Sequence, residues 1–247
     1  MNKASSQGRG VSIVGTGAYL PDRIMTNADL EKMVDTSHEW IHTRTGISER
    51  HIAREDESTS DMSTVAAQRA LENAGVRAAD VDMIVVATIT PDMVFPNTAC
   101  LVQDRLGAKK AFCFGVEAAC SGFIYGLEIG RQFVASGAIN TALIIGGEKL
   151  SCITDWQDRA TCVLFGDGAG AVVLQSRDNA RGILATVMGS DGALTDLLKM
   201  PAGGSREPAS AKTVEDRKHF IKMEGREVFK HAVRCMCDAC LKALDQA

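Results

Sequence analysis

The feature that most constrains the fold is a series of short, continuously apolar segments separated by stretches of helical character. One of them, Val81–Thr90, reads VDMIVVATIT, and two more occur at Ala142–Gly147 and Ala171–Gln175. An unbroken run of β-branched residues is typical of a strand covered on both faces, because a half-exposed strand alternates apolar and polar residues. Such strands, alternating with helices, predict an α/β fold with a parallel or mixed sheet between helical layers.

Helices are expected between these strands. Ser60–Asn73 has helical spacing of its apolar residues and is followed by Gly75, and Thr98–Leu106 is followed by Gly107. A glycine in this position commonly adopts the left-handed conformation that ends a helix. The same reasoning predicts helices at Asn27–Val34 (capped by Thr26 or Asn27), Ser37–Thr43, Ser121–Ser136 and Phe220–Ala247, strands at Val11–Gly15, Ala111–Val116 and Gly182–Met188, and an exposed loop at Ala202–Arg217.

Composition and charge argue against a nucleic-acid-binding, membrane-spanning or secreted protein. The chain has 27 Lys+Arg and 31 Asp+Glu, a formal net charge of −4, whereas a general nucleic-acid-binding protein carries a basic excess. Its apolar runs are too short to cross a bilayer, and its N-terminus has no apolar secretory signal. The eight cysteines lie mostly in apolar stretches, as Cys100, Cys113 and Cys162 do. We therefore expect a cytoplasmic protein with buried free thiols, and no nucleic-acid or membrane partner.

A weak internal repeat suggests two halves. Val11–Pro21 resembles Ile183–Leu194, since a strand leads into a glycine-containing turn in both. We expect a flexible N-terminal extension over 1–10, a first half over 11–181 and the start of a second half over 182–247. In the first half a helix leads into the next strand, so the repeat predicts a further strand beyond the last helix. The alternative is a helix that ends at a natural C-terminus.

Cys120 is the best candidate for a nucleophile. It lies between the strand Ala111–Val116 and the helix that begins near Ser121. The unpaired N–H groups and the dipole of a helix N-terminus favour the thiolate form of a nearby cysteine. The alternative is an inert buried cysteine, the commoner fate of this residue. Small neighbours leave room for a substrate and for backbone amides that contact an oxyanion: Ala118, Ala119, Ser121 and Gly122.

A second group of cysteines invites a metal interpretation. Cys235, Cys237 and Cys240 form C-x-C-x-x-C, with His231 nearby. On a helix, however, residues two apart point to different sides. We therefore favour a core position for Cys240 over a metal site, and no bound metal is expected. The apolar stripe at helical spacing consists of Phe229, Ala232, Val233, Met236, Cys240 and Leu244.

Two surface patterns allow either a functional or a purely structural interpretation. Arg226, Lys230 and Arg234 recur every four residues and form a basic stripe, which is either a solvated face or a docking site for an acidic partner. Trp40 and Arg44 have helical i, i+4 spacing, which suits either a nucleotide-base sandwich or a packed surface pair.

Two glycine-rich segments are not phosphate loops. Gly15 and Gly17 lack the third glycine of a dinucleotide fingerprint, and Gly166–Gly170 precedes a strand rather than a helix. Both are interpreted as tight turns where chains pack closely.

Four segments resemble one family, the β-ketoacyl-acyl-carrier-protein synthases III. They are Thr26–Ala53, Ala118–Phe123, Phe165–Ala171 and Met223–Lys230. The resemblance implies a thiolase-like layered αβαβα fold of two similar halves, the second incomplete in this chain, and a homodimer. It also implies the initiating condensation of type II fatty acid synthesis, from acyl-CoA and malonyl-acyl-carrier protein. Coenzyme A thioester is then a substrate, and no cofactor is expected.

The resemblance assigns roles to individual residues. Cys120 matches the acylated nucleophile. Trp40 and Arg159 match the residues that hold the adenine of coenzyme A, with Thr36 and Arg44 nearby. Phe95 matches the residue that reaches the acyl pocket of the partner subunit, and Phe165 and Met223 match residues that line the substrate tunnel. Lys230 matches a residue that contacts the carrier protein, and Arg226 and Arg234 flank it on the basic stripe.

One departure from the family pattern is large. The family completes its site with a histidine in a P-H-Q-A-like turn and an asparagine in a G-N-T-S-like turn, and neither motif occurs here. Decarboxylation needs donors that stabilise an enolate oxygen. The first hypothesis is therefore a condensing enzyme represented by an incomplete or inactive form. The alternative is a non-catalytic paralogue that binds coenzyme A or the carrier protein. Acetyl is the expected primer, but its length is not readable from these residues.

Overall fold

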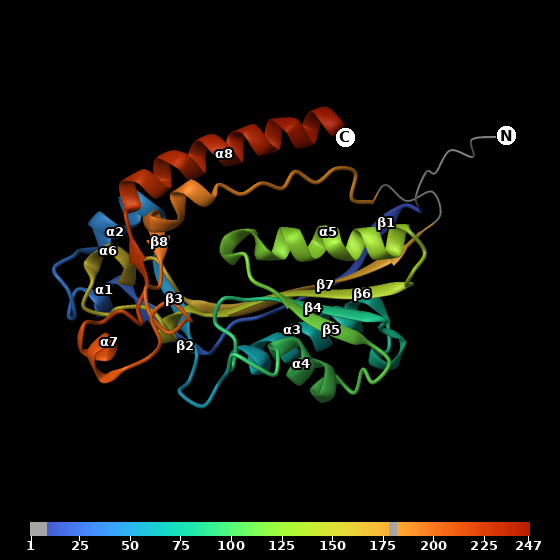
Figure 1. Cartoon of the computed structure of the whole chain (residues 1–247), viewed down its shortest axis with the longest axis horizontal. Coiled ribbons are helices and arrows are strands. Elements are labelled where there is room, and N and C mark those ends of the chain that lie inside the picture. The colour runs from blue at the N-terminus through green and yellow to red at the C-terminus, as the bar shows by residue number, and fades with distance from the viewer. Residues whose placement is uncertain (1–8, 178–181) are drawn as a thin grey trace.

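The computed structural model describes residues 9–177 and 182–247 (Figure 1). Its centre is a five-stranded sheet of order β1-β7-β6-β4-β5. β4 is parallel to β5 and β6, whereas β7 is antiparallel to β1 and β6, so the expected mixed sheet is confirmed. The strands are β1 (Val11–Tyr19), β4 (Met83–Ala87), β5 (Phe112–Val116), β6 (Thr141–Lys149) and β7 (Asp167–Ser176).

Helices cover both faces of this sheet (Figure 1). α3 (Thr59–Ala74) and α4 (Thr98–Leu106) lie on one face, and α5 (Gly122–Ala135) lies on the other. Gly75 and Gly107 adopt the left-handed conformation that ends α3 and α4, as predicted. The short helix η1 (Ala78–Asp80) links α3 to β4.

The continuously apolar strands are buried on both sides. In β4, Ile84 and Val86 belong to the core that includes α3, whereas Met83 and Val85 belong to the core on the α5 face. Ile144 of β6 also lies on the α5 face and is fully buried. Because successive side chains of a strand point to opposite faces, only an unbroken apolar run fills both cores.

Glycines let α5 approach the sheet closely. A Cβ at Gly130 would lie 2.8 Å from Cδ1 of Ile144, and one at Gly126 would lie 3.2 Å from Cγ2 of the same residue. Real Cβ atoms are rarely so close to a neighbour, so this face of α5 accepts only the smallest residue. The close packing holds the N-terminal end of α5 at a fixed position over the strand ends.

The two glycine-rich segments predicted as tight turns lie mostly inside strands. Gly15 and Gly17 belong to β1, and Gly168 and Gly170 belong to β7. A Cβ at Gly17 would lie 2.2 Å from the carbonyl oxygen of Ala66 in α3. The predicted close packing is therefore correct, and the predicted turns are wrong, because a strand pressed against a helix also requires glycine.

A group of small elements lies beyond the carboxyl ends of β4 and β5 (Figure 1). Thr26 and Ser37 cap the first two of its helices, close to the predicted starts. The buried guanidinium of Arg50 donates to the side-chain oxygen of Asn27 and to the backbone oxygen of Val163, which joins the group. Its elements are β2 (Arg23–Thr26), α1 (Asn27–Leu30), α2 (His38–Thr45), β3 (Glu49–Ile52), η3 (Leu150–Cys152) and α6 (Arg159–Cys162).

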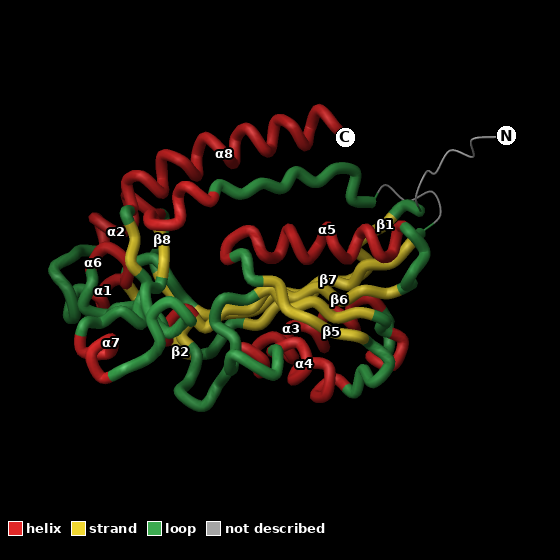
Figure 2. The backbone as a smooth tube through the Cα atoms, in the orientation of Figure 1, coloured by secondary structure: helices red, strands yellow, loops and turns green. Residues whose placement is uncertain are grey.

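Residues 182–247 differ from the expectation in two places. The strand predicted at Gly182–Met188 is absent; this segment is an extended loop beside α5 (Figure 2), tied by the Ile183 amide to Val11. The predicted loop Ala202–Arg217 contains a short helix whose Thr213 is buried. The elements are η4 (Gly192–Leu197), β8 (Leu198–Lys199), α7 (Ala211–Glu215), β9 (Lys222–Met223) and α8 (Gly225–Gln246), with β8 antiparallel to β9.

The last helix, α8, has no buried residue. The predicted core position of Cys240 is wrong, since this cysteine is exposed together with Phe229, Met236 and Leu244 of the same apolar stripe. Helical spacing predicts which residues share a face, but burial requires a second surface against that face. None of the helices in the described ranges is long and apolar enough to span a membrane.

The cysteines are also less buried than expected. All eight are free, as predicted, but only Cys162 is buried, while Cys100 and Cys113 are half-buried. The remaining five are exposed: Cys120, Cys152, Cys235, Cys237 and Cys240. Most of the predicted N-terminal extension over 1–10 lies outside the described residues; of the two that are described, Arg9 donates its amide to the Ala135 oxygen.

Candidate active site

Cys120 lies where β5 passes into α5. β5 ends at Val116, a short helical turn η2 (Ala119–Ser121) follows, and α5 begins at Gly122. The thiol is exposed. In Figure 1 the N-terminal end of α5 faces the group of small elements that includes α2 and α6. The junction predicted from the sequence is therefore present, with the cysteine at its surface.

Two local features distinguish this junction. Ala119 has φ +43°, in the left-handed region that residues with a Cβ rarely adopt. The N-cap of α5 is Ser121, whose side chain makes no capping hydrogen bond. The Gly122 amide donates to the backbone oxygen of Ala119, and Ser121 does not cap the amides that follow it. Amides without a side-chain cap are the groups that bind an anion at a helix N-terminus.

Trp40, Arg44 and Arg159 come together from two helices. The Arg44 guanidinium carbon lies 4.6 Å from the centre of the Trp40 ring, and that of Arg159 lies 5.2 Å from it. Arg159 also donates to the backbone oxygen of Asp35 at 2.8 Å. Nearby in sequence, the hydroxyl of Thr36 is buried and has no hydrogen-bond partner in the described part of the chain. A buried hydroxyl without a partner costs free energy that a ligand acceptor recovers.

The segment around Phe95 is an exposed apolar tip on a fixed base. Val94 is 91% exposed and Phe95 is 83% exposed. At the base, Asp92 and Thr98 bond one another, because the Asp92 amide donates to the Thr98 hydroxyl and that hydroxyl donates to the Asp92 carboxylate. Ser60 of α3 donates both its amide and its hydroxyl to Asp92. The tip is therefore held away from the body of the protein.

A half-buried carboxylate at the same edge of the sheet was not found from the sequence. Glu148, at the end of β6, accepts hydrogen bonds from the Thr90 hydroxyl at 2.5 Å, the Ile89 amide at 2.9 Å and the Thr88 hydroxyl at 3.2 Å. Burial raises the pKa of Glu148, against these hydrogen bonds, which act to lower it. The contacts fix the segment that leads to the Phe95 tip. They join residues about sixty positions apart, so no local pattern predicts them.

Residues of the segment 182–247 reach the end of the molecule that carries α2 and α6 through β9. Asp155 is buried and pairs with Arg217 and, at 3.3 Å, with Lys222. These partners hold the pKa of Asp155 down at about 2, mainly through the Arg217 hydrogen bond. Half-buried Phe165 follows α6, and half-buried Met223 is in β9, which contacts α6.

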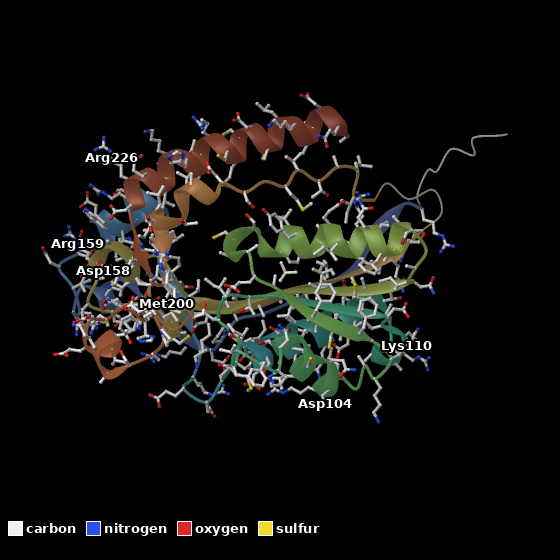
Figure 3. All side chains as sticks on the ribbon, in the orientation of Figure 1. Asp104, Lys110, Asp158, Arg159, Met200 and Arg226 are labelled. Carbon is white, nitrogen blue, oxygen red and sulfur yellow. The ribbon has the colours of Figure 1, made fainter. Side chains whose placement is uncertain are left out.

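The basic stripe on α8 is exposed. Arg226, Lys230 and Arg234 all face solvent, and the Lys230 ammonium lies 3.5 Å from the Glu227 carboxylate. In Figure 3, Arg226 and Arg159 are both labelled at the end of the molecule that carries α2 and α6. The stripe therefore begins at the end of the molecule that carries these two helices.

Comparison with known proteins places this geometry in a family. The family model for 3-oxoacyl-[acyl-carrier-protein] synthase III matches residues 114–192, which include the Cys120 junction. The β-ketoacyl-[acyl-carrier-protein] synthase III of Desulfitobacterium hafniense strain Y51 is 56% identical over 237 residues, 96% of this chain and 72% of the relative. That of Caldanaerobacter subterraneus subsp. tengcongensis is 57% identical over 234 residues, 95% and 71% of the two chains. The chain belongs to the β-ketoacyl-acyl-carrier-protein synthase III family.

Solved structures of similar proteins have the same fold. The 3-oxoacyl-[acyl-carrier-protein] synthase III of Aquifex aeolicus VF5 superposes with a TM-score of 0.85 at 50% identity, over 96% of this chain and 72% of that one. The priming β-ketosynthase of the R1128 polyketide pathway superposes with a TM-score of 0.89 at 36% identity, over 97% and 71%. The expected thiolase-like α/β fold is confirmed, and the family is one of acyl-transferring condensing enzymes that initiate fatty acid synthesis.

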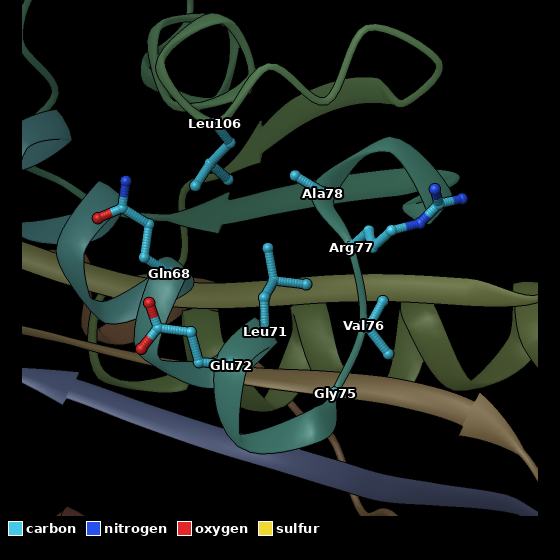
Figure 4. A pocket seen from close by; sticks show the side chains of 8 residues that line it. All are labelled: Gln68, Leu71, Glu72, Gly75, Val76, Arg77, Ala78 and Leu106. Atoms are coloured by element: carbon cyan, nitrogen blue, oxygen red, sulfur yellow. The ribbon is translucent and has the colours of Figure 1, made fainter.

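Two hollows on the surface are not lined by the residues to which the family resemblance assigns roles. One, of about 300 Å³, is lined by residues of α3, α4, η1 and the turn between α3 and η1, including Leu71, Arg77 and Leu106 (Figure 4). The other, of about 500 Å³, is lined by residues that include Met25 and Trp156. Neither contains Cys120 or Trp40. In the described ranges no group of three His, Cys, Asp or Glu side chains could hold a metal ion.

Proposed function

We propose that this chain carries out the initiating condensation of type II fatty acid synthesis through a thioester on Cys120. Acyl-CoA, with acetyl-CoA as the expected primer, and malonyl-acyl-carrier protein give 3-oxoacyl-acyl-carrier protein, CO₂ and coenzyme A. The observation that carries the proposal is the exposed Cys120 thiol at the N-terminal end of α5, whose first turn has no side-chain cap.

The first step is an acyl transfer. The Cys120 sulfur attacks the thioester carbonyl, the new C–S bond forms, the bond to the coenzyme A sulfur breaks, and coenzyme A leaves with the proton that Cys120 gives up. The oxygen carries negative charge in the tetrahedral intermediate. The amides of the first turn of α5 that follow Gly122, which Ser121 does not cap, are the donors that we assign to this charge. They are fixed before substrate arrives, because α5 packs closely on the sheet.

Coenzyme A is the ligand that we assign to the Trp40 group. An aromatic ring with two guanidinium groups suits a purine base and the phosphates attached to it. The nearness of Arg159 to Trp40, 119 residues apart in sequence, supports this assignment, as does the unpartnered Thr36 hydroxyl. An adenine that enters between Trp40 and Arg159 displaces the guanidinium from the ring.

The Phe95 tip is the feature from which we assign a contact with a second subunit and with the pocket for the acyl chain. A largely exposed aromatic side chain on a fixed base has the properties of an interface anchor, since it loses little entropy on burial. We propose that Phe95 enters the acyl pocket of a second copy in a homodimer. Phe165 and Met223 are assigned to the tunnel that leads to Cys120, on the support of their half-buried positions around α6 and β9.

The carrier protein is the partner that we assign to the basic stripe. Arg226, Lys230 and Arg234 present positive charge on a chain whose formal net charge is −4. Such a local field attracts an acidic protein even when the net charges repel. The stripe begins at the end of the molecule where the coenzyme A residues lie. A carrier protein docked there presents its thioester to the same tunnel.

The test follows the acyl group. Wild-type protein incubated with acetyl-CoA is expected to gain the mass of one acetyl group, located on Cys120 by peptide mapping. Cys120→Ser should gain none, whereas Cys152→Ser, which removes another exposed cysteine, should behave as wild type. An unmodified Cys120 overturns the proposal. Coenzyme A binding without acetylation would favour the binding paralogue instead.

A second measurement separates the two half-reactions. Addition of malonyl-acyl-carrier protein to the acetylated protein should release CO₂ and form 3-oxoacyl-acyl-carrier protein. Decarboxylation needs donors to an enolate oxygen, and the family histidine and asparagine motifs do not occur among these 247 residues. Acetylation without product would therefore confine the activity of this chain to acyl transfer.

A further inference from the structure

Two cysteines outside the proposed active site face one another. The thiol of Cys113 in β5 donates a hydrogen bond to the sulfur of Cys100 in α4, at a sulfur–sulfur distance of 3.6 Å. Both are free and half-buried. No other hydrogen bond joins two cysteines within residues 9–177 and 182–247. Neither sulfur has a role in the acyl transfer proposed above.

The packing of α4 against β5 holds the two sulfurs in this position. At the start of α4, the Asn97 side chain fills the space beside Gly115, where a Cβ would lie 2.3 Å from the amide nitrogen. At its end, the Gln103 side chain donates to the backbone oxygens of Ala108 and Ala111 in the loop that leads to β5. The helix and the strand are thus fixed to each other on both sides of the cysteine pair.

We propose that Cys100 and Cys113 form an oxidation site, at which a hydroperoxide converts the two thiols to a disulfide that links α4 to β5. With hydrogen peroxide, the Cys100 sulfur attacks one peroxide oxygen, the O–O bond breaks, and sulfenic acid and water form. The Cys113 sulfur then attacks the Cys100 sulfur and displaces the hydroxyl as a second water. Two thiols and one peroxide give one disulfide and two waters, so the two electrons lost by sulfur reduce the peroxide.

The surroundings of Cys113 support this order of events. Burial, together with the neighbouring Cys100, raises the pKa of Cys113 to about 11, so this thiol keeps its proton at neutral pH. A protonated thiol is a poor nucleophile toward peroxide. Cys113 is therefore the resolving cysteine. The sulfurs must approach from 3.6 Å to about 2.0 Å for the bond to form.

This site is independent of the proposed function. Cys113 is the second residue of β5, whereas Cys120 lies beyond the opposite end of that strand. The bridge closes a loop that includes the turn between α4 and β5, and it restricts the unfolded chain more than the folded one. Oxidised protein should therefore melt at a higher temperature than reduced protein, by about 5 °C, while Cys120 in the folded protein keeps its position.

The experiment treats reduced wild-type protein with hydrogen peroxide, blocks the remaining thiols after denaturation, and maps tryptic peptides. The bridge is expected to join peptide 78–105, in which Cys100 is the one cysteine, to peptide 111–131. The second peptide contains both Cys113 and Cys120, so the same treatment of Cys120→Ser shows which of them is linked. A link that vanishes in Cys120→Ser overturns the proposal, as does oxidation of Cys100 to sulfinic acid without a link.

Matched variants and a melting measurement complete the test. Cys100→Ser and Cys113→Ser should each abolish the linked peptide, whereas Cys237→Ser on exposed α8 should leave it unchanged. Because either core variant could fold poorly, the wild-type melting temperature is compared before and after oxidation. A rise that dithiothreitol reverses supports the bridge; an unchanged or lowered melting temperature contradicts it.

Discussion

Two parts of this chain are held together in different ways. Residues 11–176 contain a five-stranded sheet with a core on each face, and their helices α3 and α5 are pressed onto it. Residues 182–247 contain two strands of two residues each and the helix α8, which has no buried residue although it is 22 residues long. Both parts have strong helical patterns. Because most of the stability of a protein helix comes from packing of its apolar face, we expect α8 to be held less firmly than α3 and α5.

Specific contacts join the two parts. The Ile221 amide donates to the Ile153 oxygen at 2.9 Å, and the Asp155 carboxylate accepts from Arg217 and Lys222. These polar contacts attach the second part near α6 and β9, while Ile183 packs against the apolar core on the α5 face. This comparison leads to three predictions with decreasing effects.

The largest effect is expected from removing a buried side chain in the first part. Ile144→Ala empties a fully buried position in β6 and should lower the free energy of unfolding by about 4 kcal/mol. Leu244→Ala removes a similar volume from α8, where the residue is 74% exposed, and should change the free energy of unfolding by less than about 0.5 kcal/mol. Urea unfolding followed by circular dichroism measures both. Similar losses from the two variants would contradict the contrast drawn above.

A smaller effect is expected from adding one methyl group. Gly17→Ala places a Cβ against the backbone of α3 and should destabilise the protein by about 3 kcal/mol, because backbone atoms cannot move aside as a flexible side chain can. Gly204→Ala adds the same group where no atom lies within 4 Å. It should be neutral within about 0.5 kcal/mol. Thermal melting of the pair tests this, and a tolerant Gly17 would show that α3 is less closely packed on β1.

The smallest effect concerns the contact between the two parts and depends on pH. The pKa of Asp155 is about 2 in the folded protein against 3.8 in the unfolded chain. Its ion pair therefore stabilises the fold above about pH 4, and the contribution is lost as pH falls toward 2. Since Arg217 is partly exposed, we expect about 1 to 2 kcal/mol.

The variant Asp155→Asn should lose this amount at pH 7, and its stability should fall less than that of wild type between pH 4 and pH 2. Asp104→Asn, at an exposed position of α4, serves as the control. Urea unfolding at several pH values is the measurement. Parallel pH profiles for Asp155→Asn and wild type would show that another carboxylate dominates the acid response.

Much of the fold was predictable because its signals are local. The apolar runs identified the five strands of the central sheet, whereas the short strands β2 and β3 were not predicted. Gly75 and Gly107 marked the ends of two helices. The position of Cys120 between a strand and a helix was equally local. The strand expected at Gly182–Met188 failed because a strand needs a neighbour to pair with, and pairing is not encoded in the segment itself.

Other features were decided only by the tertiary structure. The approach of Arg159 to Trp40, the network around Glu148 and the contact of Cys100 with Cys113 all join residues that different elements bring together. The exposure of the α8 stripe is of the same kind, since its spacing was correct and its burial was not. Sequence by itself determined where elements begin and which residues share a face, because those depend on backbone geometry over a few residues. Which faces meet depends on the packing of the whole chain. Tertiary packing therefore decided the surroundings of each side chain to which a function is assigned above.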